Sequence, residues 1–223
     1  MTPAAKRARG SLVVKVLVAA GILGVLAFLF LQSLRSTRAE PYVAARARLA
    51  PWTLAIETAV QPGDAVLVAR GSQELVSALF RQVFTRMMES LNAPATAAIP
   101  IVLKSELGGP LAQLFTPEAL LIAAREAGLE GSGVFEPHCM AHRRVSQPGS
   151  TRQVYFAVFT SAPFDRFRRD LATRAARDLP DVRFDPEALS PIMFVAASDG
   201  RLSNWLPLRV ERARECVAPI EVR

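Results

Sequence analysis

Cysteine and histidine are scarce in this chain of 223 residues, which contains two of each. The short motifs HExxH, GxGxxG, CxxCH and the P-loop are absent, so zinc proteases, dinucleotide-binding enzymes, c-type cytochromes and NTPases have no motif support. Gly131-Ser132-Gly133 lacks the G-x-S-x-G spacing of a hydrolase nucleophile and is predicted to be a loop. We therefore predict no catalytic residue and no cofactor.

A clustered basic face is also missing, although the net charge is +7. Four of the basic residues precede or begin the long apolar run near the N-terminus, and the rest of the chain has 23 basic against 20 acidic residues. Its arginines are interspersed with acids, whereas a phosphate backbone requires a contiguous positive surface. Nucleic acid is thus not an expected partner. Arginine outnumbers lysine by 24 to 3, which is typical of a GC-rich bacterial coding sequence.

One long apolar segment dominates the N-terminal region. Every residue from Val16 to Leu31 is apolar or glycine, and extension to residues 12–34 gives the roughly 30 Å needed to cross the hydrocarbon core of a bilayer. The alternative is a cleaved signal peptide, with small residues near Ala39 as the cleavage site, but the run exceeds the usual core of such a peptide. We predict a single transmembrane helix over residues 12–34.

The orientation of this helix is not decided by charge, because basic residues flank both ends. The short tail, residues 1–11, and the early position of the helix favour a cytoplasmic N-terminus. Residues 35–52 would then be a linker to an exported domain. The predicted location is the inner membrane of a bacterium, single-pass, with the soluble domain in the periplasm.

The soluble region resembles itself when it is shifted by 91 residues. Residues 99–115 then lie without a gap over residues 190–206, and a predicted helix at 72–91 lies over another at 163–182. The motif Gln-Pro-Gly occurs at a predicted turn in each half. The coincident residues in the first alignment are Pro100 and Pro191, Ile101 and Ile192, Gly109 and Gly200, and Leu111 and Leu202.

These matches predict a tandemly duplicated unit of strand, turn, strand, helix and strand. The first copy covers residues 53–138 and has an extra helix at 117–127, and the second covers residues 139–223 and ends in a closing strand from Cys216. Apolar runs at 154–160 and 192–197 are typical of central strands buried on both faces. The predicted fold class is α/β (α+β), with mixed sheets covered by helices.

His138, Cys139, Met140 and His142 are close in the sequence and form a ligand set that copper would accept. In a strand the two histidines would be about 13 Å apart, too far for one ion, and a helix would turn Met140 away from them. The repeat also places Met140 and His142 at packing positions. We therefore predict a structural strand and no metal ligands.

Two carboxylates, Glu106 and Asp199, follow the Pro-Ile strand of their respective copies. Acids at strand ends can serve acid–base chemistry, but acids at turns are common without it. The prediction leans away from an enzyme.

The two cysteines, Cys139 and Cys216, begin predicted strands in equivalent positions. Cysteines of an exported domain tend to pair, yet equivalent places in a duplicated sheet can be far apart. The sequence leaves the disulfide open. If formed, it closes a loop of about 77 residues, worth about 4 kcal/mol in the chain-entropy model.

The preferred functional hypothesis is a membrane-anchored, non-enzymatic envelope protein that binds or positions a protein partner. The first alternative is a periplasmic enzyme or small-molecule binder that uses the cleft between the copies, and the second is a copper-like metal-handling protein. Convergence of polar residues in that cleft would favour the first alternative.

Overall fold

The computed structural model describes residues 17–18, 20–30, 40–49, 51–57, 65–87, 89–147, 150–199 and 209–223. The chain divides into two compact units, Met1–Glu40 and Pro41–Arg223. In the first unit, the described residues 17–18 and 20–30 are helical. None of the helices formed by described residues is long and apolar enough to cross a membrane. Much of the predicted span, including residues 12–16 and 31–34, lies outside the described residues.

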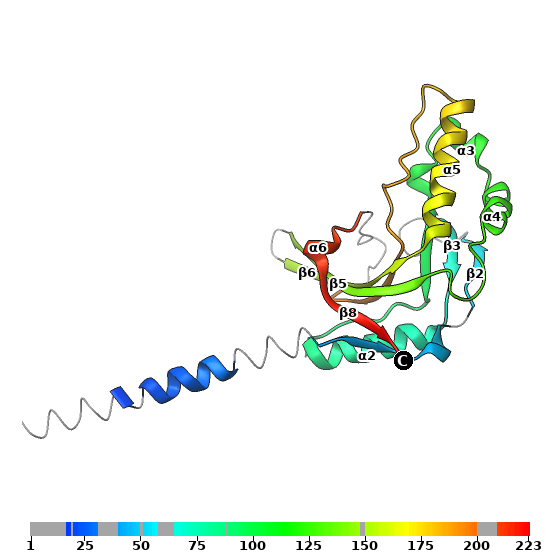
Figure 1. Cartoon of the computed structure of the whole chain (residues 1–223). Coiled ribbons are helices and arrows are strands. Elements are labelled where there is room, and N and C mark those ends of the chain that lie inside the picture. The colour runs from blue at the N-terminus through cyan, green and yellow to red at the C-terminus, as the bar shows by residue number, and fades with distance from the viewer. Residues whose placement is uncertain are drawn as a thin grey trace, which may run out of the picture. The chain divides into compact units, whose positions relative to one another are not determined.

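The second unit is a mixed α+β structure with two sheets (Figure 1). The smaller sheet is antiparallel and has the order β2-β3-β4, formed by Thr53–Ile56, Ala65–Arg70 and Ala98–Leu103. All six residues of β4 are buried. Pro100 lacks an N–H donor but fits β4, because β4 is the last strand of this sheet and has a pairing partner on one side only.

The larger sheet has the order β1-β8-β5-β6-β7. The pair β1–β8 is parallel, and the other pairs in this sheet are antiparallel. Side chains are buried on both faces along residues 154–159 of β6 and along β7, as the apolar runs predicted. The strands are β1 (Tyr42–Ala44), β5 (Glu136–Gln147), β6 (Ser150–Thr160), β7 (Ile192–Ala197) and β8 (Cys216–Val222).

Two long helices cover these sheets. α2 (Gln73–Met87) follows the first hairpin but packs against β1 and β7 of the larger sheet. α5 (Ala162–Asp178) follows the second hairpin, and its Arg168 reaches the carbonyl of Ile101 on β4. The main hydrophobic core contains residues of both sheets and both helices. The two halves of the unit therefore fold around one shared core.

Shorter helices complete the second unit. α4 (Pro117–Glu126) contacts β2 and β3 and nearly coincides with the helix predicted at 117–127. The hydroxyl of Thr116 accepts a hydrogen bond from the Ala119 amide, and Gly128 adopts φ +78° just after the helix, which is how the sequence marks its ends. The remaining elements are α3 (Pro110–Leu114), α6 (Arg212–Glu215), and the 3-10 helices η1 (Arg46–Arg48) and η2 (Lys104–Glu106).

The order of elements is the same in the two halves. Each has an antiparallel hairpin, then a helix, then a third strand antiparallel to the second strand of the hairpin. Ile101 lies in β4 and Ile192 in β7, the third strand of each half. Parts of the predicted alignment, namely residues 61–63, 148–149 and 200–206, lie outside the described residues.

Residues 42–44 and 46–48, within the predicted linker at 35–52, form β1 and η1, and β8 and a side chain of α2 supply hydrogen-bond partners to β1. The prediction that Cys139 begins its strand is wrong. Cys139 lies inside its strand and does not open it, because pairing with β6 continues back to Glu136.

Candidate functional site

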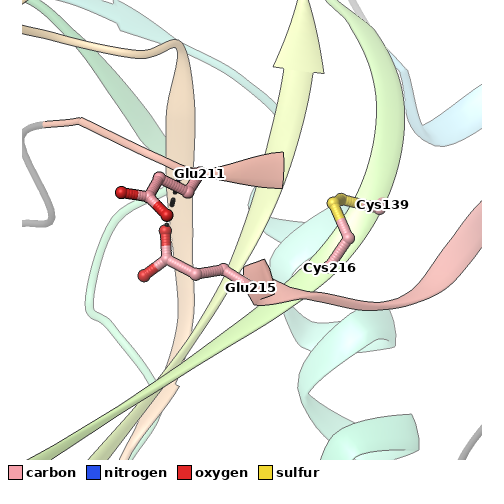
Figure 2. Close-up of a disulfide and its surroundings, with 4 residues drawn as sticks. All are labelled: Cys139, Glu211, Glu215 and Cys216. Carbon is pink, nitrogen blue, oxygen red and sulfur yellow. Dashed lines mark hydrogen bonds between the residues drawn. A yellow bond between two sulfur atoms is a disulfide. The ribbon is translucent and has the colours of Figure 1, made fainter. Parts of the chain in front are cut away.

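A charged pocket lies where β5 meets the segment before β8. Its volume is about 350 Å³, and we call it the arginine pocket. One part of its lining belongs to β5, and the other part belongs to the segment just before Cys216. A disulfide joins Cys216 to Cys139 on β5, with 5.7 Å between their Cα atoms. Figure 2 shows Glu211 and Glu215 near that bridge. The pocket is lined by His142, Arg143, Arg144, Arg209, Glu211, Arg214 and Glu215.

One buttressed ion pair shapes this pocket. Arg143 donates through Nε to the carboxylate of Glu215 and through Nη2 to the carbonyl of Arg209 at 2.8 Å. Glu215 also accepts the amide N–H of Glu211 at 2.9 Å. Burial raises the pKa of Glu215, but the hydrogen bonds from Arg143 and Glu211 and the charges of Arg143 and Arg214 outweigh it, so the pKa lies below its ordinary value.

The pocket carries an excess of positive charge, with four arginines against two glutamates. Arg214 pairs with Glu211 at 3.2 Å, and Arg209 pairs with Glu187 at 3.1 Å outside the pocket. Arg144 is exposed and has no ion-pair partner among the residues that the structure describes. Guanidinium groups bind carboxylates and phosphates through paired hydrogen bonds. The arrangement is therefore suited to holding an anionic group.

His142, which lines this pocket, packs against neighbouring side chains of the sheet. Its ring stacks on Tyr155 with 4.6 Å between centroids, and its Nε2 lies 3.0 Å from Oε1 of Gln153. Gln153 donates in turn to Glu89 at 2.8 Å. This packing agrees with the sequence interpretation of His142 as a strand residue.

The four residues weighed as copper ligands do not converge. Met140 is fully buried in the main core. A different set is close together: the ligand atoms of His138, Cys139 and Cys216 all lie within 4.8 Å of one another. Sequence reasoning missed this set because Cys216 is 77 residues from Cys139. The available signal was that the chain has two cysteines and that a histidine precedes one of them.

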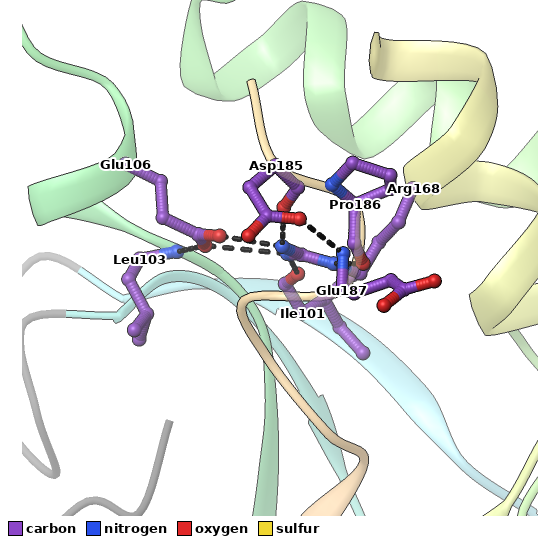
Figure 3. Close-up of polar contacts among 7 residues, drawn as sticks. All are labelled: Ile101, Leu103, Glu106, Arg168, Asp185, Pro186 and Glu187. Carbon is purple, nitrogen blue, oxygen red and sulfur yellow. Dashed lines mark hydrogen bonds and ion pairs between the residues drawn. The ribbon is translucent and has the colours of Figure 1, made fainter. Parts of the chain in front are cut away.

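Both strand-end carboxylates are in ion pairs. Asp199 lies 3.3 Å from Arg152. Glu106 pairs with Arg168, whose side chain is fully buried between the two halves of the unit (Figure 3). A guanidinium has five N–H donors, and five hydrogen bonds leave Arg168, to Glu106 twice and to the carbonyls of Ile101, Asp185 and Pro186. The hydrogen-bond donors of Arg168 are therefore all used within the protein, and we assign this side chain a structural role.

A groove lies between α4 and α5. It has a volume of about 340 Å³ and brings together polar residues from the two halves, which is the feature that the enzyme or small-molecule hypothesis required. The charged residues that line it are Glu126, Arg166, Asp170 and Arg174.

The loop prediction for Gly131-Ser132-Gly133 is confirmed. Gly131 and Gly133 have φ values of +111° and +74°, and Gly131 exchanges backbone hydrogen bonds with Trp52. The loop is therefore hydrogen-bonded to the residue that directly precedes β2.

Comparison with known proteins adds no assignment. The chain matches no protein-family model, no curated protein and no solved structure.

Proposed function

We propose that this chain is a single-pass envelope protein of a bacterium, anchored by residues 12–34, whose exported domain is a non-enzymatic binding module. The observation that carries the proposal is the arginine pocket, an open concave site with excess positive charge. Its ligand would be an acidic group, most simply carboxylates presented by a protein partner in the envelope.

Export of the domain is supported by the bridge between Cys139 and Cys216. Disulfides persist in the periplasm and are rare in the cytosol of most bacteria. The apolar run at residues 16–31 supports an anchor ahead of it. We further propose that the domain arose by duplication of a strand–strand–helix–strand unit, supported by the shared element order and by the location of Ile101 and Ile192 in the third strand of their respective halves.

A reporter fusion tests the location. An enzyme that is active only outside the cytoplasm, fused after Arg223, should be active in cells. Activity of a cytoplasmic reporter at the same place, with none from the first, would overturn the proposed topology.

The binding role is tested by charge reversal. The full chain, captured from detergent-extracted membranes after cross-linking, should bring down one stoichiometric partner. Arg144→Glu combined with Arg214→Glu should abolish that capture, whereas Arg177→Glu, an exposed position at the end of α5, should leave it unchanged. A clean monomer without a partner would contradict the binding role.

A periplasmic enzyme or small-molecule binder is the second candidate, and the polar groove between α4 and α5 favours it. The substitution pair Glu126→Ala and Asp170→Ala tests whether this groove, rather than the arginine pocket, is the functional surface of the domain. Loss of partner capture by this pair, with normal capture by the arginine-pocket variant, would move the functional site to the groove.

A further inference from the structure

We infer that His138, Cys139 and Cys216 form a binding site for one thiophilic metal ion, zinc(II) or copper(I), when the Cys139–Cys216 disulfide is reduced. The inference does not depend on the proposed binding role of the arginine pocket. Its first support is the short distance between the ligand atoms, since the imidazole nitrogen and the two sulfurs all lie within 4.8 Å of one another.

A β-bulge in β5 brings His138 to this cluster. Pro137 pairs with Phe159 and Cys139 pairs with Val158, so His138 is an extra residue without a counterpart in β6. In a regular strand, neighbouring side chains point to opposite faces of the sheet. A bulge changes that alternation locally and redirects a side chain, which explains how adjacent residues both reach one point.

A second irregularity, in β8, brings Cys216 to the same place. Met140 pairs with Ala218 but Ala141 pairs with Cys216, so Val217 is the extra residue. Regular pairing would place Cys216 opposite His142, on the face of the sheet away from Cys139. The bulge therefore moves Cys216 to the face that carries Cys139.

The ligand set matches the chemistry of thiophilic ions. Zinc binds thiolates at about 2.3 Å and imidazole at about 2.0–2.1 Å, and copper(I) also prefers soft sulfur ligands. Ligand atoms within 4.8 Å need only a small adjustment to surround one ion. The imidazole can adjust because His138 is exposed, and Cys216 is half-buried, which gives a reductant access to the bridge.

The disulfide and the metal site exclude each other. A dithiol reductant supplies two electrons and two protons, so the S–S bond breaks, the cysteines become two thiols and the dithiol becomes a disulfide. Binding of the ion then releases the two thiol protons, because thiolates are the ligands. The oxidised chain would therefore not bind the ion at this site.

The test measures zinc(II) binding by the full chain in detergent, reduced with a phosphine and kept free of oxygen. Competition with a chromophoric chelator and native mass spectrometry should show one ion per chain, and the ion should raise the Tm of the reduced protein. The disulfide-bonded chain should show no such binding. Equal binding by the oxidised and reduced forms, or no binding by the reduced form, would overturn the inference.

Variants at the two histidines test the ligand set. His138→Ala should weaken binding by at least about tenfold, since one of three ligands is lost, and its exposed position makes loss of folding no concern. His142→Ala is the matched control and should bind as the unaltered chain does. Full affinity in His138→Ala would show that the cysteines act without the imidazole and would overturn the three-ligand site. Alkylation of both thiols in the reduced chain should abolish binding, and persistent binding would place the ion elsewhere.

Discussion

The contact between Gly71 and Trp52 shows how one missing side chain permits the packing of another. A Cβ atom added to Gly71 would lie 2.5 Å from Cζ3 of Trp52. The indole cannot easily move away, because Phe135 and Phe159 pack edge-on against it at 5.2 and 5.5 Å between centroids. Gly71 is therefore required by packing.

Gly71→Ala should lower the free energy of unfolding by about 1–3 kcal/mol, the usual cost of overpacking a core. Gly108→Ala is the control, since its added Cβ meets nothing within 4 Å, and it should change stability by less than about 0.5 kcal/mol. Urea denaturation followed by tryptophan fluorescence measures both. Equal effects of the two substitutions would show that the Trp52 contact is not limiting.

Glu215 should make stability depend on pH in the acid range. Its pKa in the folded chain is below its ordinary value, so its ionised form stabilises the fold at pH values above the ordinary pKa. That stabilisation is lost as the pH falls through the lowered pKa of the folded state. Between pH 7 and pH 3, Glu215→Gln should therefore lose less stability than the unaltered chain.

The control for this pH series is Glu221→Gln. Glu221 is exposed and pairs with Arg223 at 2.8 Å, and exposed pairs contribute little. Its pH profile should follow that of the unaltered chain. Parallel profiles for all three proteins would contradict the assigned role of Glu215.

At the scale of elements, the edge strand β1 is hydrogen-bonded by a side chain of α2, at the edge where another strand could otherwise pair. Oε1 of Gln82 accepts the Val43 amide at 2.9 Å, and Nε2 of Gln82 donates to the Val43 carbonyl at 2.8 Å. Gln82 belongs to α2, so the free edge of this three-residue strand is closed by a helix. Closing a sheet edge in this way also protects it from pairing with other chains.

Gln82→Ala should destabilise β1 by about 1–3 kcal/mol, because a backbone N–H and C=O lose their partners. Hydrogen exchange at the Val43 amide should accelerate, while exchange within β6 should change much less. Arg81→Ala, at an exposed neighbouring position, serves as the control. Unchanged protection of Val43 in Gln82→Ala would refute the edge-closing role.

At the scale of the whole second unit, Arg168 links the two halves. It belongs to α5, and its partners include Ile101 on β4, Glu106 just after β4, and two carbonyls in the segment that leads to β7. Its guanidinium also lies 5.0 Å from the ring centroid of Phe184. Loss of this side chain would leave the Glu106 carboxylate without its counter-charge, with only the Leu103 amide as a donor among the described residues, and would remove a donor from three carbonyls.

Arg168→Ala should therefore lower the free energy of unfolding by about 3–5 kcal/mol, as expected for breaking a buried ion pair. Arg166→Ala, an exposed position on the same helix, should change it by less than about 0.5 kcal/mol. Calorimetry measures both values and the cooperativity of unfolding. A small effect of Arg168→Ala would mean that the halves are held together by apolar packing alone.

Local patterns in the sequence were sufficient for several elements. The cap at Thr116, the proline at 117 and the glycine at 128 predicted the ends of α4 within one residue. Apolar runs predicted that β6 and β7 would be buried on both faces. These predictions succeed because hydrophobic periodicity and helix capping depend on residues close together in the sequence and need no distant partner.

Tertiary structure alone decided the pairings between distant segments. The strand character of β1 depends on β8 and Gln82, and the environment of Arg168 depends on residues that precede it by more than 60 positions. The cluster of His138, Cys139 and Cys216 depends on two bulges. A shift of one residue in register moves a side chain to the other face of a sheet. No local pattern encodes that register, so sequence spacing could neither bring Cys216 to Cys139 nor place His138 beside them.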